Sequence, residues 1–498
     1  MIQMANLLFI AIDLGAESGR CMAGSFDGDR IRLQEVKRFP NGPVGVAGHL
    51  HWDVLRLFEE IKGGLRACAA LGGEVAGIGL DSWGVDFALL DRHDALVGNP
   101  YHYRDRRTEG MLAEAFRRVT KQEIYRRTGI QFMPINTLYQ LLSMVVCKDP
   151  ALEVAQTLLM IPDLFNFWLC GTKGCEFTDA TTTQCYDPTA GDWAWDLLER
   201  LSIPQRIFPR VIPPATVLDA LRDEVAEETG LGRVPVIAPA CHDTAAAVAA
   251  VPAAGPDFAY ISSGTWSLVG VEVRAPILSD AAMQANFTNE GGVCGTYRFL
   301  KNVMGLWLLQ ECRRVWAQDR PVTYEELIEL ARRAPPFGPI VDPDDERFLR
   351  PTDMLAAIRS ACEETGQPVP DTRGAVVRCI LESLAVKYRW VVERLEAITG
   401  RPIRVIHIVG GGSRNELLCQ LTADATGRPV YAGPAEATAL GNALVQAMAL
   451  GRLGGLDDIR AVVRRSVQVA LYEPHPDPRW EEAAERMSRS DHRPGVEG

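Results

Sequence analysis

Apolar and polar residues follow two different periods along the first ninety positions of the chain. Residues 7–13 form an apolar run that ends in an acid, as a buried strand does, and residues 75–81 repeat this pattern. Residues 21–26 and 30–36 flank an Asp-Gly-Asp turn, which predicts a hairpin. Apolar positions at helical spacing fill residues 52–70. A hairpin, a helix and a parallel strand in this order predict a layered α/β fold.

A similar plan returns near the middle of the chain. Residues 11–20 and 260–269 each read as an apolar strand, a glycine, a small or polar residue, a serine and a second apolar strand. The second copy follows residues 251–257, a short segment rich in Pro, Ala and Gly that is typical of a connection between domains. Because the repeat stands just after this connection, we interpret it as the trace of an internal duplication.

The rest of the pattern completes the expected domain division. Residues 371–398 carry apolar positions three and four apart, which predicts a long helix, and residues 403–409 predict the strand after it. We expect an N-terminal domain over residues 1–251 and a C-terminal domain over residues 252–480. Residues 481–498 are charged and show no periodic apolar face, so we expect a frayed tail there.

Composition and charge disfavour several classes of protein. The 498 residues are 47% hydrophobic and 23% charged, which is typical of a globular protein of this length. The 52 Lys and Arg against 64 Asp and Glu give a net charge of −12, which argues against broad binding to nucleic acid. No apolar run is long enough to span a membrane. The first apolar run follows no basic segment and reads as a strand, so we expect no signal peptide and a cytoplasmic protein.

The 12 cysteines do not change this picture. They are scattered along the chain and form neither a CxxC pair nor a Cys/His cluster at zinc spacing. We therefore expect free thiols that are buried or half-buried.

Three glycine-bearing turns directly follow apolar strands, at residues 15–20, 262–267 and 410–412. Glycine lets backbone N–H groups approach a phosphate closely, and a strand-to-turn junction presents several such donors together. The third turn also opens a helix, whose N-terminus favours negative charge. Each turn alone is equally consistent with a tight connection that binds nothing, and neither the Walker A pattern nor GxGxxG is present. Three such turns in two similar halves favour a nucleotide held between domains.

Two carboxylates stand beside apolar strands at positions suited to phosphate chemistry. Asp13 ends the first strand, where a carboxylate can position Mg²⁺ directly or through water. Asp243 follows the strand at residues 234–239 and begins an Ala-rich helix, where it can accept a proton from a sugar hydroxyl. Both are also consistent with ordinary turn-forming or helix-capping aspartates. His242 fits a hydrogen-bonding neighbour as well as it fits a catalyst.

Seven motifs, in this order along the chain, resemble those of the FGGY family of carbohydrate kinases. They are residues 13–20, 81–87, 103–108, 241–245, 262–267, 300–305 and 409–412. Four further segments agree with the family, at residues 129–140, 178–184, 286–292 and 305–310. The resemblance extends from about residue 7 to about residue 475, and the ordered combination is far more specific than any single motif.

The resemblance implies a fold, a reaction and a set of site residues. The fold would be two actin-like, ribonuclease-H-like domains with a catalytic cleft between them. The motifs are most similar to those of the family's L-rhamnulose kinases, so the reaction would transfer the γ-phosphoryl group of ATP to the 1-hydroxyl of L-rhamnulose, with Mg²⁺, in the breakdown of L-rhamnose. Asp243 would be the general base, and the sugar positions would be Gly84, His242, Asp243, Thr244 and Asn302. The ATP positions would be Ala16, Glu17, Ser18, Gly19, Arg20, Thr265, Gln310, Gly410, Gly411 and Gly412, with Asp13 as the Mg²⁺ position.

Some of these positions have a second reading. A ketose needs short polar groups beside an apolar wall, which residues 83–86 and 103–107 supply. Trp83 is also consistent with core packing, and Arg107 with a surface ion pair. Glu17 departs from the Gly-Thr or Ser pair that the kinase superfamily often has, so it either points outward or contacts the metal.

Two other functions stay compatible with the sequence. One is a kinase of another ketose, such as L-fuculose or L-xylulose. The other is an actin-like sugar sensor that binds nucleotide without transferring phosphate, although the presence of both Asp13 and Asp243 argues against it. The expected partners are a ketose and ATP, with neither nucleic acid nor membrane, and both a monomer and a homodimer are compatible with the chain.

Overall fold

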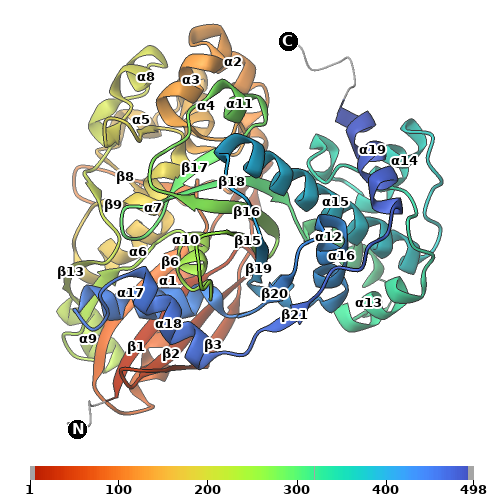
Figure 1. The fold of residues 1–498 in the computed structure, drawn as a ribbon. Helices are drawn as coiled ribbons and strands as arrows, with labels where there is room; N and C mark the ends of the chain where they lie inside the picture. The colour runs from red at the N-terminus through yellow and green to blue at the C-terminus, as the bar shows by residue number, and fades with distance from the viewer. Residues whose placement is uncertain (1–5, 319, 492–498) are drawn as a thin grey trace. The chain divides into compact units, whose positions relative to one another are not determined.

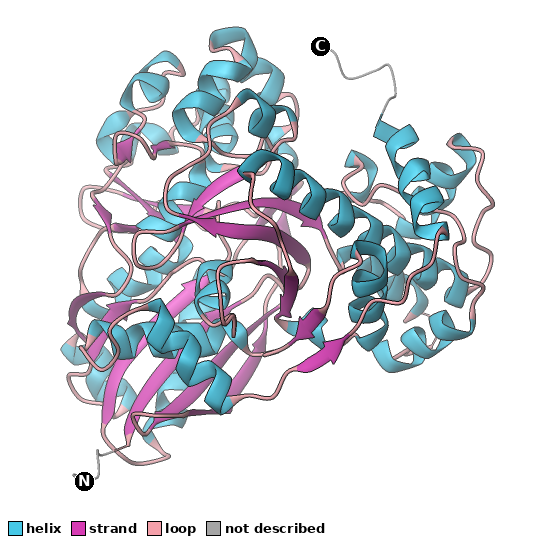
Figure 2. Cartoon of the chain, viewed as in Figure 1, coloured by secondary structure: helices cyan, strands magenta, loops and turns pink. Residues whose placement is uncertain are grey.

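The chain folds into two compact units, which Figures 1 and 2 show as ribbons. The computed structural model describes residues 6–318 and 320–491. The first unit comprises Met1–Pro252, Glu272–Phe299 and Ala437–Val467, and the second comprises Ala253–Val271, Leu300–Glu436 and Gln468–Gly498.

The first unit is built on a six-stranded sheet with the order β13-β14-β6-β1-β2-β3. β1 is antiparallel to β2 and parallel to β6, and β2 and β3 form the predicted hairpin. The centre of β1 is fully buried, which explains its continuous apolar run. The strands are β1 (Leu7–Leu14), β2 (Ser18–Phe26), β3 (Ile31–Pro40), β6 (Val75–Ser82), β13 (Thr216–Ala220) and β14 (Pro235–Ala238).

Helices α1 (Val54–Ala69) and α17 (Ala437–Ala449) pack on this sheet, and α1 confirms the predicted first helix. The approach of α17 depends on glycine in β6: a Cβ at Gly79 would lie 2.5 Å from the side-chain oxygen of Asn442. Although residues 437–467 stand late in the chain, α17 and α18 (Leu456–Ser466) therefore belong with the N-terminal sheet.

The other α-helices and strands of the first unit surround this sheet or form a second core. β7 pairs with β8, and helices α2, α4 and α8 share a core that contains Leu138, Leu142 and Trp193. The elements are β4 (Val44–Val46), β5 (His49–His51), β7 (Phe87–Leu90), α2 (Met111–Arg118), α3 (Lys121–Thr128), α4 (Thr137–Cys147), α5 (Ala151–Val154), β8 (Thr157–Met160), α6 (Ile161–Cys170), β9 (Cys175–Glu176), α7 (Phe177–Ala180), β10 (Tyr186–Asp187), β11 (Asp192–Trp193), α8 (Trp195–Arg200), β12 (Val211–Ile212), α9 (Asp223–Thr229), α10 (Asp243–Ala249), α11 (Asp280–Gln284) and β17 (Thr288–Gly291).

The second large sheet has seven strands in the order β17-β18-β16-β15-β19-β20-β21. β15 is antiparallel to β16 and parallel to β19, just as β1 is antiparallel to β2 and parallel to β6. This shared arrangement supports the interpretation of an internal duplication. The strands are β15 (Phe258–Ser263), β16 (Trp266–Val273), β18 (Tyr297–Met304), β19 (Val405–Val409), β20 (Val430–Ala432) and β21 (Ala470–Tyr472), and the boundary between the units falls inside β16 and β18.

The helices of the second unit include the predicted long helix. α15 begins after Thr372, whose hydroxyl accepts a hydrogen bond from Ala375 N, and it ends at Gly400, which has a φ of 67°. The helices are α12 (Trp307–Trp316), α13 (Tyr324–Arg333), α14 (Met354–Glu364), α15 (Arg373–Thr399), α16 (Glu416–Thr426) and α19 (Arg479–Asp491).

The expectation of a frayed tail over residues 481–498 is wrong for its first part. Residues 481–491 belong to helix α19. The helix packs through Trp480, Ala483 and Met487, which are buried and three or four positions apart. This apolar face is short and stands among charged residues, so the sequence pattern missed it. Residues 492–498 lie outside the described part of the chain.

Two expectations from composition can be compared with the structure. All twelve cysteines are free, and most of them are buried. Within residues 6–318 and 320–491, no helix combines the length and the apolar character that crossing a membrane requires.

Candidate active site

The first glycine turn connects β1 to β2 in the first unit. Gly15 N donates a hydrogen bond to Ser18 O at 3.0 Å, and the Asn41 amide donates to Gly15 O at 2.8 Å. Glu17 is exposed, which agrees with the outward orientation that the sequence left open. Gly19 has a packing reason of its own, because a Cβ there would lie 2.2 Å from the ring of Phe39.

Two aspartates stand side by side at the ends of β1 and β6. Asp13 and Asp81 are register partners on these parallel strands, and both are buried. The Arg20 guanidinium donates a hydrogen bond to Asp13 Oδ2. Asn442 Nδ2 donates to Asp81 Oδ2 at 2.6 Å, and Asp81 Oδ1 is buried with no hydrogen-bond partner among the described residues. Burial and the charge of Asp13 raise the pKa of Asp81 well above its ordinary value.

The donor set around Asp13 fits a magnesium ion. Carboxylate oxygens are the ligands that Mg²⁺ prefers, and proteins hold the ion near phosphates through one or two carboxylates plus water. Asp13 and the orphaned Asp81 Oδ1 supply such oxygens. Within the described residues no three His, Cys, Asp or Glu side chains form a closed metal cage. The protein thus offers a partial site, which phosphate and water oxygens would complete.

Asp243 begins helix α10 with one carboxylate oxygen anchored. Its Oδ1 accepts hydrogen bonds from Thr244 N at 2.5 Å and Thr244 Oγ1 at 3.2 Å, and His242 Nε2 lies 3.4 Å away. No hydrogen bond from the described residues reaches Oδ2, and 30% of the side chain is exposed. Burial, followed by the charge of Asp13, raises the pKa of Asp243. Oδ2 is therefore the oxygen that can receive a proton from a ligand.

The orientation of His242 is fixed by two residues from the next part of the chain. Arg298 Nη2 lies 3.0 Å from His242 Nδ1, and a guanidinium can only donate, so Nδ1 accepts. Glu290 Oε2 lies 3.4 Å from the same Nδ1, and Nε2 faces Asp243 Oδ1. Glu290 Oε2 lies 3.2 Å from Arg298 Nη2 and balances its charge, and Arg298 is completely buried.

Sequence reasoning missed the roles of Glu290, Arg298 and Asp81. Asp81 ends a predicted strand, so a list of acids at strand ends would have found it, and Glu290 lies in residues 286–292, which resemble the family. Arg298 gives no such signal. It stands 56 residues from His242, and only the position of β18 brings the two side chains together.

Gly84 lies in a tight connection between β6 and β7. A Cβ at Gly84 would come within 2.9 Å of the Thr182 side chain, and Thr182 Oγ1 accepts a hydrogen bond from Val85 N at 3.1 Å. Val85 adopts a φ of 69°, an unusual conformation for a β-branched residue. The Thr182 side chain thus packs against the predicted sugar position. Ser82 N donates to Cys241 O at 2.8 Å, which brings this connection beside the Asp243 segment.

Asp86 organises the residues next to Gly84. Its Oδ2 accepts hydrogen bonds from Trp52 Nε1 at 2.6 Å and Trp83 Nε1 at 3.1 Å, and its Oδ1 accepts one from Gln140 Nε2 at 2.9 Å. Burial raises the pKa of Asp86 to about 6. Trp83 is buried against Trp52, so it packs in the core as one of its two readings proposed. Arg107 does not form the surface ion pair that its second reading proposed; it donates to Gln140 Oε1 at 2.6 Å.

The third glycine turn lies in the second unit, between β19 and α16. Gly410 has a φ of 82°, which favours glycine, and its N–H donates to Pro434 O at 3.0 Å. A Cβ at Gly412 would lie 2.0 Å from Ser263 Oγ, so this glycine lets the turn lie against β15. Gly411 is exposed, and a Cβ there would meet nothing within 4 Å.

The other predicted positions of the second unit surround the turn between β15 and β16. Thr265 O accepts a hydrogen bond from Trp307 N at 3.1 Å, which places the start of α12 against this turn. Gln310 lies one turn into α12, and its Oε1 is buried without a hydrogen-bond partner in the described residues. Asn302 is a half-buried residue of β18.

The predicted site residues therefore form two sets. The first unit holds the Mg²⁺ position, the first turn and the sugar and base positions, namely Asp13, Ala16, Glu17, Ser18, Gly19, Arg20, Gly84, His242, Asp243 and Thr244. The second unit holds Thr265, Asn302, Gln310, Gly410, Gly411 and Gly412. Within each set, hydrogen bonds or strand pairing connect the segments that carry these residues.

Two family models and several curated relatives match nearly the whole chain. The N-terminal domain model of the FGGY family of carbohydrate kinases matches residues 8–250, and the C-terminal domain model matches residues 259–450. The chain is 46% identical over 475 residues to a rhamnulokinase from Bacteroides thetaiotaomicron, covering 95% of this chain and 97% of that protein. It is 40% identical over 469 residues to a rhamnulokinase from Bacillus subtilis, covering 94% and 96%.

Solved structures share the fold at low sequence identity. A ligand-bound xylulose kinase from Lactobacillus acidophilus superposes with a TM-score of 0.78 at 19% identity, covering 96% of both chains. Plasmodium falciparum glycerol kinase with ADP gives a TM-score of 0.77 at 14% identity, covering 99% of both chains. The expected actin-like α/β fold is confirmed by these neighbours. Two matching domain models and relatives that align over nearly the full length establish that the chain belongs to the FGGY family of carbohydrate kinases.

Proposed function

We propose that this carbohydrate kinase transfers the γ-phosphoryl group of ATP to the 1-hydroxyl of L-rhamnulose, giving L-rhamnulose 1-phosphate and ADP. The sequence identity of 40–46% to several rhamnulokinases over nearly the whole chain supports the choice of sugar. The anchored Asp243, with its accessible Oδ2, is the observation that carries the choice of catalytic base.

The proposed proton transfer begins at Asp243. Thr244 and His242 hold Oδ1, so Oδ2 is oriented to accept the proton of the attacking hydroxyl. The raised pKa of Asp243 makes the carboxylate a stronger base than an ordinary exposed aspartate, and it also means that turnover falls as the pH drops and Asp243 becomes protonated. Arg298 contacts His242 Nδ1 and so orients the ring with Nε2 next to this carboxylate.

The proposed phosphate contacts combine backbone and side-chain groups. The turns at Ala16–Arg20 and Gly410–Gly412 would supply N–H donors, and Arg20 would supply a positive charge. Mg²⁺, held through Asp13, supplies charge neutralisation on the phosphates when it is bound. Gly84, His242, Thr244 and Asn302 would bind the sugar, and Thr265 and Gln310 the nucleotide.

The proposal also assigns a role to each domain and a cellular compartment to the enzyme. We assign sugar binding and the base to a domain at residues 1–251, and nucleotide binding mainly to a domain at residues 252–480. Closure of the two on both substrates would exclude water from the γ-phosphate. The enzyme would act in the cytoplasm, where its free thiols stay reduced.

A panel of ketoses tests the choice of sugar. The purified protein is assayed with ATP and Mg²⁺ by release of ADP, using L-rhamnulose, L-fuculose, L-xylulose and D-xylulose. We expect the highest kcat/KM with L-rhamnulose. If another ketose is turned over as well or better, the sugar assignment is wrong, although the carbohydrate kinase family is unaffected.

A further inference from the structure

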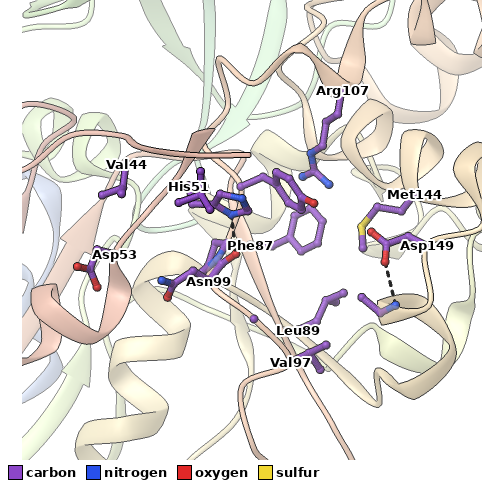
Figure 3. A pocket seen from close by; sticks show the side chains of 15 residues that line it. Val44, His51, Asp53, Phe87, Leu89, Val97, Asn99, Arg107, Met144 and Asp149 are labelled. Atoms are coloured by element: carbon purple, nitrogen blue, oxygen red, sulfur yellow. Dashed lines mark hydrogen bonds between the residues drawn. The ribbon is translucent and has the colours of Figure 1, made fainter. Parts of the chain in front are cut away.

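The first unit contains a pocket of about 480 Å³ (Figure 3). It includes none of the predicted metal, nucleotide and base positions and not Gly84, but it includes Arg107, the last residue of the segment 103–107 that the sequence placed beside the ketose. Phe87, Leu89, Val97 and Met144 supply an apolar side, and the Arg107 guanidinium is directed toward the pocket, 5.9 Å from the centre of the Phe87 ring. This volume is in the range of sites that bind small molecules, and the mixture of an apolar wall with a few polar groups is typical of them.

Arg107 carries a charge that the described residues do not pair. Its Nη2 donates to Gln140 Oε1 at 2.6 Å, while its Nη1 is buried without a hydrogen-bond partner. Its guanidinium lies 4.0 Å from the centre of the Tyr101 ring and forms no ion pair with a carboxylate of the described residues, although Asp105 Oδ1 accepts a hydrogen bond from the Arg107 backbone N–H at 2.9 Å. Burial lowers the pKa of Arg107, although Asp86 and other acids oppose this from a longer distance.

The two acids of the pocket are engaged elsewhere. Asp53 Oδ1 accepts a hydrogen bond from Arg56 N at 3.1 Å and caps helix α1. Asp149 Oδ1 accepts one from Ala151 N at 2.9 Å, at the start of α5. Neither carboxylate forms a hydrogen bond or ion pair with Arg107, although the charge of Asp149 acts on the guanidinium from a longer distance.

The pocket also has an aromatic wall, on which a planar part of a ligand can lie. The rings of His51 and Tyr101 are 4.5 Å apart, and Arg107 covers Tyr101. Arg107 is half-buried, but its Nη1 is withdrawn from water, and a charged group loses hydration at a cost unless a partner replaces it. We propose that this pocket binds a small organic anion whose carboxylate or phosphate pairs with Arg107 and whose flat or apolar part lies against Tyr101 and Phe87.

The proposed site is connected to the predicted sugar position Gly84 without including it. Arg107 donates to Gln140, Gln140 donates to Asp86, and Asp86 accepts from Trp83, which precedes Gly84. The inference itself rests only on the pocket and its unpaired charge. It holds whichever ketose the enzyme phosphorylates.

Direct binding of defined probes tests the proposal. Benzoate, phenyl phosphate and the neutral benzyl alcohol are titrated into the full-length protein by calorimetry, with ADP present to occupy the nucleotide site. We expect at least one of the two anions to bind and benzyl alcohol to bind at least tenfold more weakly. The preferred anion identifies the head group as carboxylate or phosphate. If neither anion binds, or if benzyl alcohol binds equally well, the proposal is wrong.

Variants locate the binding. Arg107→Gln retains a donor for Gln140 but removes the charge, and it should weaken binding at least tenfold. Arg106→Gln, at the exposed neighbouring position, is the matched control and should change the dissociation constant less than twofold. Val46→Glu adds a negative charge at the exposed rim of the pocket without touching a buried group, so it provides a second variant should Arg107→Gln fold poorly. Unchanged binding in both Arg107→Gln and Val46→Glu would overturn the proposal.

Discussion

Replacement of Arg298 by Met should destabilise the protein strongly. The change removes the hydrogen bonds to His242 Nδ1 at 3.0 Å and to Gly291 O at 2.8 Å, and it leaves the buried Glu290 carboxylate without its counter-charge. Removing one partner of a buried ion pair costs about 3–5 kcal/mol. At about 2 °C per kcal/mol, this corresponds to a fall in Tm of roughly 6–10 °C.

Differential scanning calorimetry of the variants separates the ion pair from general damage. Glu290→Gln should also lower the Tm, because it leaves Arg298 charged and buried, whereas the double variant Arg298→Met/Glu290→Gln should lose much less than the sum of the two single changes. Arg233→Met is the control, since Arg233 forms an exposed ion pair with Asp223 that is worth about 0–1 kcal/mol. Additive losses in the double variant, or a fall no larger than that of the control, would refute the electrostatic reasoning.

Three further predictions follow from the same geometry. Asp243→Asn should lower kcat at least ~100-fold, the scale of a lost general base, while calorimetry shows ketose binding largely kept; unchanged turnover would remove Asp243 from its proposed role. Burial raises the pKa of Glu176 to about 7, so the folded protein binds more protons than the unfolded chain between about pH 4.5 and 7, and its stability falls as the pH rises through this window. The Tm should therefore be higher at pH 5 than at pH 7.5 and the slope smaller in Glu176→Gln; a wild-type Tm that rises over this range would contradict the prediction. Gly412→Ala forces a Cβ against Ser263 and should cost about 1–3 kcal/mol, whereas Gly411→Ala should change stability by less than ~0.5 kcal/mol; equal Tm values for the two variants would contradict the steric argument.

The regular elements were largely predictable because their patterns are local. The strand before Asp13 shows a continuous apolar run, since both faces of β1 are covered, and α15 shows its period over 27 residues. Helix α19 was missed because it buries only Trp480, Ala483 and Met487 among charged neighbours. The short strand β7 pairs with β8, about seventy residues later, and no local pattern specifies that partner.

The sequence by itself predicted the strands that precede the three glycine turns, the long helix α15 and the candidate base Asp243. Only the tertiary structure decided which charges meet. It anchors Asp243 Oδ1, brings Arg298 to His242 from 56 residues along the chain, and leaves Arg107 Nη1 buried without a hydrogen-bond partner among the described residues, beside a pocket. The reason is physical: periodicity depends on neighbours along the chain, whereas hydrogen-bond partners and burial depend on how distant strands and helices pack together.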